Sequence, residues 1–143
     1  MSNFIKMLIP VLILLTPVLF IDISVSISDI VSPPLCYNTS CIDGNPRHSK
    51  CDADVQTHLK EKVQNVTLQM RYSARCDASW ASAIVPPYSI LYLQDIKGNR
   101  YGEYTVEDDG ISAPHFSGMA PGKSLSVCVK LPQTNNSICT KNK

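Results

Sequence analysis

Hydrophobic and polar residues alternate along two segments of the chain, with the period of two that is typical of half-buried β-strands. In residues 65–72 (NVTLQMRY) every second side chain is apolar, which leaves Arg71 on the solvent side. Residues 125–131 (LSVCVKL) have the same pattern, with Cys128 on the face opposite to the valines. The pattern predicts two strands that each turn one face toward a core.

A third segment, residues 88–94 (YSILYLQ), is apolar on both faces except for one serine, which favours a central strand. The sequence Lys-Gly-Asn at 97–99 predicts a turn, so residues 100–107 (RYGEYTVE) would return as the second strand of a hairpin. Residues 111–123 contain two glycines and two prolines, and we expect a loop with at most one short strand there.

Two segments fit more than one kind of element. In residues 54–65 an apolar residue recurs at every fourth position, which fits a helical stripe as well as one side of a strand. The charged residues 60–62 favour a helix by propensity, but we expect a strand and a turn because the next segment is a clear strand. Residues 77–84 (DASWASAI) are small, and they predict one helical turn capped by Asp77.

Together these elements predict an all-β fold, either a small antiparallel sandwich or a partly open barrel. At 143 residues the chain has room for one domain of ordinary size, and we place it at residues 36–143. We find no internal repeat and no low-complexity segment in the sequence.

The N-terminal residues have the layout of a secretory signal peptide. One positive charge precedes the apolar run 7–21, and small residues suited to cleavage follow it, so we expect a signal peptide over residues 1–26 and a disordered leader over residues 27–35. An uncleaved anchor is the alternative, but so short a run does not reach across a hydrocarbon core of about 30 Å. We therefore expect a secreted protein without a permanent membrane span.

The formal net charge of the chain is +1 at pH 7. Nucleic acids and anionic membrane surfaces attract proteins through clustered basic charge, so a near-neutral chain disfavours both as partners. We expect a monomer whose partner is a cell-wall component or another secreted protein.

All six cysteines follow the predicted signal peptide, and an even number in a small exported chain predicts a disulfide framework. Folding residues 125–140 as a hairpin brings Cys128 nearly opposite Cys139, which makes this pair the best single candidate for a bridge. The partners of the other four stay open. These four are Cys36, Cys41, Cys51 and Cys76. The first three lie in segment 36–51, a predicted loop of turn-forming residues.

The stretch 36–80 carries two motifs. In the first, Cys41 precedes a turn with Pro46, and Cys51 follows the proline five residues later; the second, Arg-Tyr-Ser-x-x-Cys-x-x-x-Trp-Ala, covers residues 71–81. Both resemble the pattern of a small secreted bacterial domain of unknown function, the YjfA-like type. The departures from that pattern are at Gly44, Asn45 and Ser82. The resemblance implies a secreted, disulfide-bonded bacterial protein, and it brings no activity with it.

Trp80 is the single tryptophan of the chain, four residues after Cys76. The simpler interpretation is a core residue packed against a disulfide, since an indole buries a large apolar area. The alternative is an exposed platform of Arg71, Tyr72 and Trp80 that binds a sugar or a peptide. For Arg71 itself the simpler interpretation is an ion pair with Asp77, and the alternative is a carboxylate ligand bound through its two-pronged guanidinium.

We predict no metal, no cofactor and no catalytic residue. The histidines at 48, 58 and 115 are far apart in the sequence, and cysteines committed to bridges cannot be thiolate ligands. The candidate acid pairs for a glycoside hydrolase are Glu103 with Glu107 and the two aspartates at 108–109, but Asp-Asp-Gly at 108–110 is better explained as a turn.

Three functional hypotheses follow from the sequence. The first is a non-catalytic module for extracellular or cell-wall binding that uses Arg71, Tyr72 and Trp80. The second is a secreted effector or inhibitor of another protein that presents the cross-linked loop 36–51 as a rigid insert. The third, and weakest, is a small hydrolase with carboxylates in residues 103–109.

Overall fold

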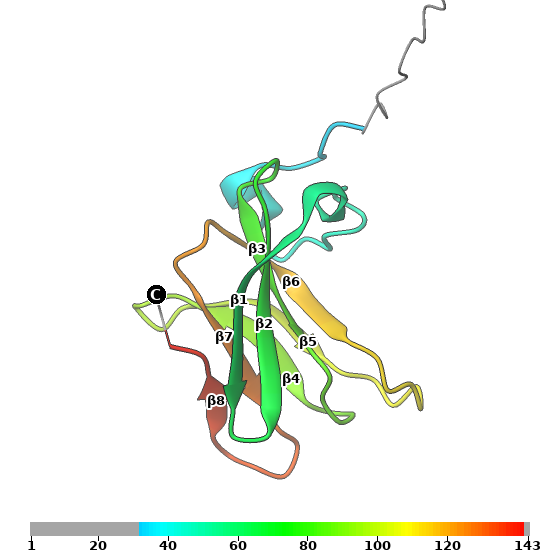
Figure 1. Cartoon of the computed structure of the whole chain (residues 1–143), viewed down its shortest axis with the longest axis vertical. Coiled ribbons are helices and arrows are strands. Elements are labelled where there is room, and N and C mark those ends of the chain that lie inside the picture. Colours follow the sequence, from blue (N-terminus) through cyan, green and yellow to red (C-terminus); the bar gives the residue numbers. More distant parts are fainter. Residues whose placement is uncertain (1–31, 142–143) are drawn as a thin grey trace, which may run out of the picture. The chain divides into compact units, whose positions relative to one another are not determined.

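The computed structural model describes residues 32–141, which form two four-stranded antiparallel sheets (Figure 1). The sheets are not closed into a barrel, so the all-β class is confirmed in its sandwich form. In spatial order the first sheet contains β1 (Gln56–Val63), β2 (Val66–Ser73), β3 (Ala78–Ala83) and β6 (His115–Pro121). The second contains β5 (Arg100–Thr105), β4 (Ile90–Gln94), β7 (Ser126–Lys130) and β8 (Ser137–Cys139). The predicted signal peptide, and the leader up to residue 31, lie outside the described residues.

The main core lies between the two sheets and is filled by alternate residues of their strands. Leu68 and Met70 of β2 are buried in it, and so are Val127 and Val129 of β7, as the alternation predicted. The predicted central strand is also confirmed, because β4 pairs with β5 on one side and with β7 on the other. No helix within residues 32–141 has the length and hydrophobicity needed to span a membrane.

The ambiguous segment 54–65 is a strand and a turn, as expected. A short 3-10 helix, η2 (Asp52–Asp54), leads into β1, and β1 pairs with β2 along its length up to Val63 opposite Val66. Gln64 takes a positive φ of 54° in the tight turn between them. Pairing with a neighbouring strand outweighs the modest helix propensity of the charged residues, since propensity differences are a few tenths of a kcal/mol per residue.

The helical turn predicted for residues 77–84 is wrong, because this segment is the strand β3, with all six residues buried. Ala81 and Ala83 face the core between the sheets, whereas Ala78 and Trp80 face a second cluster on the outer side. The alanines and serines that make up the rest of β3 allow the strand to be covered on both faces. Pairing with β3 also makes β6 seven residues long, where a loop with one short strand was expected.

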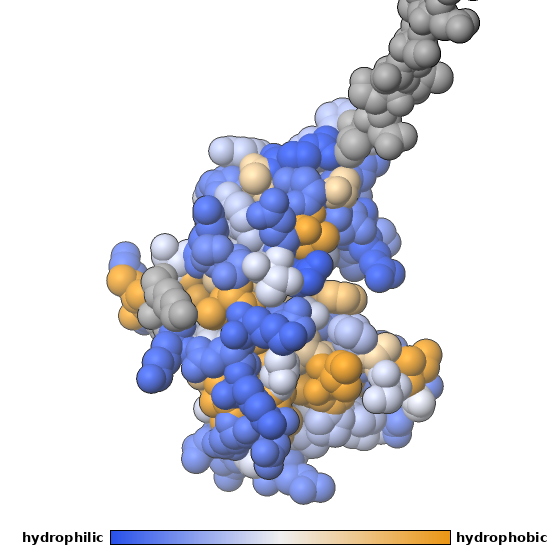
Figure 2. All heavy atoms as spheres, viewed as in Figure 1, coloured by the Kyte–Doolittle hydropathy of each residue, from blue (hydrophilic) through white to orange (hydrophobic). Residues whose placement is uncertain are grey.

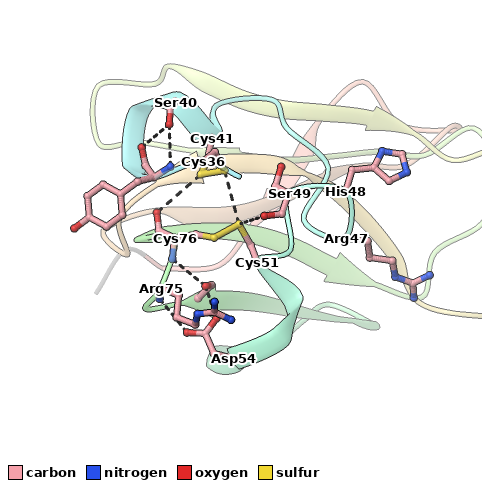
Figure 3. The surroundings of a disulfide bond; sticks show 12 residues. Cys36, Ser40, Cys41, Arg47, His48, Ser49, Cys51, Asp54, Arg75 and Cys76 are labelled. Carbon is pink, nitrogen blue, oxygen red and sulfur yellow. Dashed lines mark hydrogen bonds between the residues drawn. A yellow bond between two sulfur atoms is a disulfide. The ribbon is translucent and has the colours of Figure 1, made fainter. Parts of the chain in front are cut away.

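Three disulfides join the six cysteines in pairs that are consecutive in the sequence: first to second, third to fourth, and fifth to sixth. Cys128 is bonded to Cys139, its direct partner in the β7–β8 register, which is the pair that the hairpin suggested. The other two bonds are Cys36–Cys41 and Cys51–Cys76. These two bonds lie side by side, with the Sγ atoms of Cys36 and Cys51 3.7 Å apart (Figure 3).

Candidate binding cleft

The cysteine-rich segment 36–51 covers the outer face of β3. Trp80 is 2% exposed there, in a cluster with Ala78, Met119 and the buried cysteines 41, 51 and 76. This placement agrees with the interpretation of Trp80 as a core residue packed near a disulfide. The cysteine-rich segment therefore buries the outer face of β3, while the core between the sheets buries its inner face.

Asp43 fastens this segment to both sheets. Its backbone N–H donates to the carbonyl of Met119 at 2.9 Å, and the N–H of Met119 donates to the carbonyl of Gly44 at 3.0 Å, which forms a short parallel bridge between Ile42 and Met119 beside β6. The Asp43 carboxylate accepts a hydrogen bond of 2.7 Å from the N–H of Gly102 in β5. The loop thereby holds the adjoining edges of the two sheets, β5 and β6, at a fixed separation.

These elements enclose a cleft of about 960 Å³, lined by the cysteine-rich loop and by β2, β3, β5 and β6. We call it the arginine cleft, because Arg47, Arg71 and Arg100 all line it. Three carboxylates line it as well, and they belong to Asp43, Asp52 and Glu103. The site therefore offers both hydrogen-bond donors and acceptors, and its formal charges balance.

Arg71 and Trp80 lie opposite each other on β2 and β3, and both line the arginine cleft. Arg71 donates a hydrogen bond of 2.7 Å to the Thr57 hydroxyl, which leaves further guanidinium N–H groups for a ligand. Within residues 32–141 the one ion pair joins Arg100 to Glu103 at 3.4 Å, so Arg71 has no carboxylate partner there. The Arg71–Asp77 pair considered from the sequence does not form.

Tyr72 does not line the arginine cleft, because adjacent residues of a strand point to opposite faces. Its hydroxyl donates to Asp77 at 2.9 Å, and the Lys123 ammonium lies 4.8 Å from its ring centre. Burial of the phenol and its hydrogen bond to Asp77 raise the pKa of Tyr72 above its ordinary value of 10.0. Of the three predicted surface residues, Arg71 and Trp80 thus lie side by side at the cleft, but Trp80 is buried, and Tyr72 lies on the other face of β2.

Several other residues of the arginine cleft were not predicted as binding residues from the sequence. Arg47 comes from the cysteine-rich loop, where Asn45 accepts its backbone N–H at 2.9 Å, and its guanidinium lies 5.8 Å from the ring centre of Phe116. Tyr104 of β5 stacks on His115 of β6, with ring centres 6.4 Å apart. These residues come from segments that are far apart along the chain, so no local motif could have identified them.

The candidate carboxylates Glu103 and Glu107 are not assembled in one site. Glu103 lines the arginine cleft and is paired with Arg100, both side chains being about half exposed. Glu107 lines a separate, smaller hollow of about 310 Å³ together with Asp109. The geometry therefore gives no support to a hydrolase that would use Glu103 and Glu107 together.

Hydrophilic residues cover most of the surface seen in Figure 2, and the hydrophobic ones gather there in small, separate patches. A large exposed apolar patch would mark a stable protein interface. The arginine cleft is therefore a more prominent candidate for binding than the patches seen in this view.

A model of a protein family described as a protein of unknown function, DUF2690, matches residues 39–141 of the chain. Neither the curated proteins nor the solved structures contain a match. The matched range includes five of the six cysteines and every residue that lines the arginine cleft. The chain therefore belongs to the DUF2690 family of uncharacterised proteins.

Proposed function

We propose that this chain is a secreted, non-catalytic bacterial module that binds an extracellular or cell-wall ligand in the arginine cleft. The observation that carries the proposal is the position of Arg71, which lies in a cleft beside Trp80 without a carboxylate partner among the described residues. The apolar N-terminal run and the three disulfides support export. The resemblance to the YjfA-like type belongs to the same proposal.

The chemistry of the cleft favours a polar ligand that carries a carboxylate. A guanidinium binds a carboxylate through two parallel hydrogen bonds, and both Arg47 and Arg71 have N–H groups to spare. The rings of Tyr104 and Phe116 offer apolar faces for the carbon skeleton of a sugar or a peptide. The acidic groups of the cleft would accept hydrogen bonds from hydroxyl or amide groups of the same ligand. A peptidoglycan fragment, with the carboxylates of its peptide and the hydroxyl and amide groups of its sugars, combines these features.

The test is sedimentation of the purified protein with insoluble bacterial peptidoglycan sacculi. We expect the wild type to co-sediment and Arg71→Met to bind about 10-fold more weakly or worse, since one charge-assisted hydrogen bond contributes about 1.5–3 kcal/mol. Lys97→Met is the matched control, because Lys97 is an exposed cation in the β4–β5 turn and does not line the cleft. Its binding should equal that of the wild type.

Two results would contradict the proposal. One is equal retention of the wild type and Arg71→Met, which would place any binding outside the cleft. The other is release of soluble muropeptides from the sacculi by the wild type but not by Glu103→Gln, which would make the protein a hydrolase. Export is tested separately, by isolating the native protein from the culture medium and titrating it for free thiols.

The effector or inhibitor hypothesis keeps one specific observation in its favour. Three large apolar side chains in or beside the cysteine-rich loop are exposed, at 67% for Leu35, 62% for Tyr37 and 40% for Ile42. Crosslinked loops bind tightly because little conformational entropy is lost on binding. If this surface binds a secreted protein, Tyr37→Ser should abolish the complex, whereas Tyr88→Ser, which removes an equally exposed tyrosine elsewhere, should not.

A further inference from the structure

The disulfides Cys36–Cys41 and Cys51–Cys76 form one compact cluster of sulfur, which we call the four-sulfur knot. All four sulfur atoms lie within 4.8 Å of one another. Sulfurs of different bridges also approach closely, since the Sγ atoms of Cys36 and Cys51 are 3.7 Å apart. The third bridge, Cys128–Cys139, is not part of this cluster.

We propose that the four-sulfur knot binds one zinc ion when its two disulfides are reduced. A tetrahedral zinc ion has Zn–S bonds of about 2.3 Å, which requires sulfur–sulfur separations of about 3.8 Å. The fold already holds Cys36 and Cys51 at that separation, and the other sulfurs lie within 4.8 Å. This inference goes beyond the proposed binding function and does not rest on it.

The positions of the cysteines do not depend on the disulfides alone. The N–H of Asn38 donates to the carbonyl of Cys76 at 2.7 Å, which ties the first loop to the β2–β3 turn. The N–H of Cys51 donates to the carbonyl of Pro46 at 2.8 Å, and the N–H of Gly44 donates to that of Cys41 at 2.9 Å. These backbone bonds would keep the four thiols together after reduction, so the metal site is largely formed in advance.

The surroundings suit a closed structural site. Cys41, Cys51 and Cys76 are at most 1% exposed, and Cys36 is half-buried, so no face of the cluster is open enough for a substrate. Zinc bound by four thiolates carries a net charge of −2, which needs a compensating cation. Arg75, next to Cys76 in sequence and drawn beside the knot in Figure 3, has a buried Nη1 without a hydrogen-bond partner. A guanidinium at that place would compensate the anionic cluster.

Reduction by a dithiol opens both bridges of the four-sulfur knot. Each bridge takes up two electrons and two protons from one molecule of a dithiol, which closes to its own disulfide, and four cysteine thiols result. Zinc then replaces the thiol protons and is bound by four thiolates. In a reducing environment, zinc would fasten the same three chain segments that the disulfides fasten in an oxidising one.

The test uses the purified chain, reduced with dithiothreitol and freed of it by anaerobic gel filtration. Cobalt(II) is the probe, since a tetrahedral cobalt site with four thiolates gives intense visible bands that zinc abolishes on displacement. We expect one equivalent of cobalt in the wild type and in Cys128→Ser/Cys139→Ser, and none in Cys51→Ser/Cys76→Ser. The oxidised wild type should bind none.

Trp80 emission reports whether the reduced chain is folded around the knot, because this residue packs in the same cluster. The proposal is overturned if the reduced wild type stays folded and shows no cobalt bands. It is also overturned if the reduced chain unfolds and added metal neither refolds it nor produces the bands. Persistence of the bands in Cys51→Ser/Cys76→Ser also overturns it. Arg75→Gln tests the compensating charge, and we expect zinc affinity to fall about 10-fold or more.

Discussion

Gly102 gives the sharpest test of how the two sheets meet at the cleft. It has a φ of +62° in β5, and it lies directly against Gly118 of β6. A Cβ added to Gly102 would lie 2.2 Å from the carbonyl oxygen of Gly118 and 2.3 Å from its carbonyl carbon. Both are backbone atoms, so no side chain can move to make room, and β5 would have to separate from β6.

The cost of Gly102→Ala has two parts. A non-glycine residue with this backbone conformation costs about 1–2 kcal/mol, and forcing an extra methyl group into a packed site costs about 1–3 kcal/mol. We therefore expect a loss of about 2–5 kcal/mol of unfolding free energy. The matched control is Gly110→Ala, because Gly110 has a similar φ of +67° but no atom within 4 Å of the added Cβ. It should lose only the backbone part, about 1–2 kcal/mol.

The assay is urea unfolding followed by the fluorescence of Trp80, the single tryptophan, which is 2% exposed in the folded state. Equal slopes with urea would show that the variants unfold over the same surface, so that midpoints can be compared. If the losses in Gly102→Ala and Gly110→Ala agree to within about 0.5 kcal/mol, the close approach of β5 and β6 is refuted. Since Gly102 and Gly118 also line the arginine cleft, the same variant should bind sacculi more weakly.

Further predictions concern the loop, the hairpin disulfide and one turn. Asp43→Ala removes the acceptor for the Gly102 N–H and should cost about 2 kcal/mol of stability in urea, whereas Asp43→Asn, which keeps an acceptor oxygen, should cost less. Opening the Cys128–Cys139 bridge with paired serines should cost about 3 kcal/mol, the chain-entropy value for a loop of this length, and an unchanged midpoint would contradict this. Hydrogen bonds to Asp95, first of all from the Asn99 side chain, lower the pKa of that carboxyl below its ordinary 3.8. The ionised Asp95 carboxylate therefore contributes its full stabilisation above pH 3.8, and this stabilisation is lost as the pH falls through the lower pKa of the folded state. In a plot of unfolding free energy against pH, Asp95→Asn should fall less steeply than the wild type below that pH.

The sequence by itself determined the features that depend on neighbours along the chain. Alternation in residues 65–72 and 125–131 was enough to predict strands, because a period of two puts one face of a strand in a core whatever it packs against. The hairpin register near residue 134 likewise brought Cys128 opposite Cys139. Export stays a prediction of the N-terminal composition.

Only the tertiary structure decided what depends on distant segments. Residues 78–83 are a strand because β2, β6 and the cysteine-rich loop cover them, and nothing in their own small side chains excludes a helical turn. The pairing of Cys51 with Cys76 follows from the same loop lying over β3. The arginine cleft was beyond sequence reasoning, because Arg47, Arg71 and Phe116 line one cleft only when the cysteine-rich loop meets β2, β3, β5 and β6. Side-chain proximity of this kind is set by packing between sheets, which leaves no local period in the sequence.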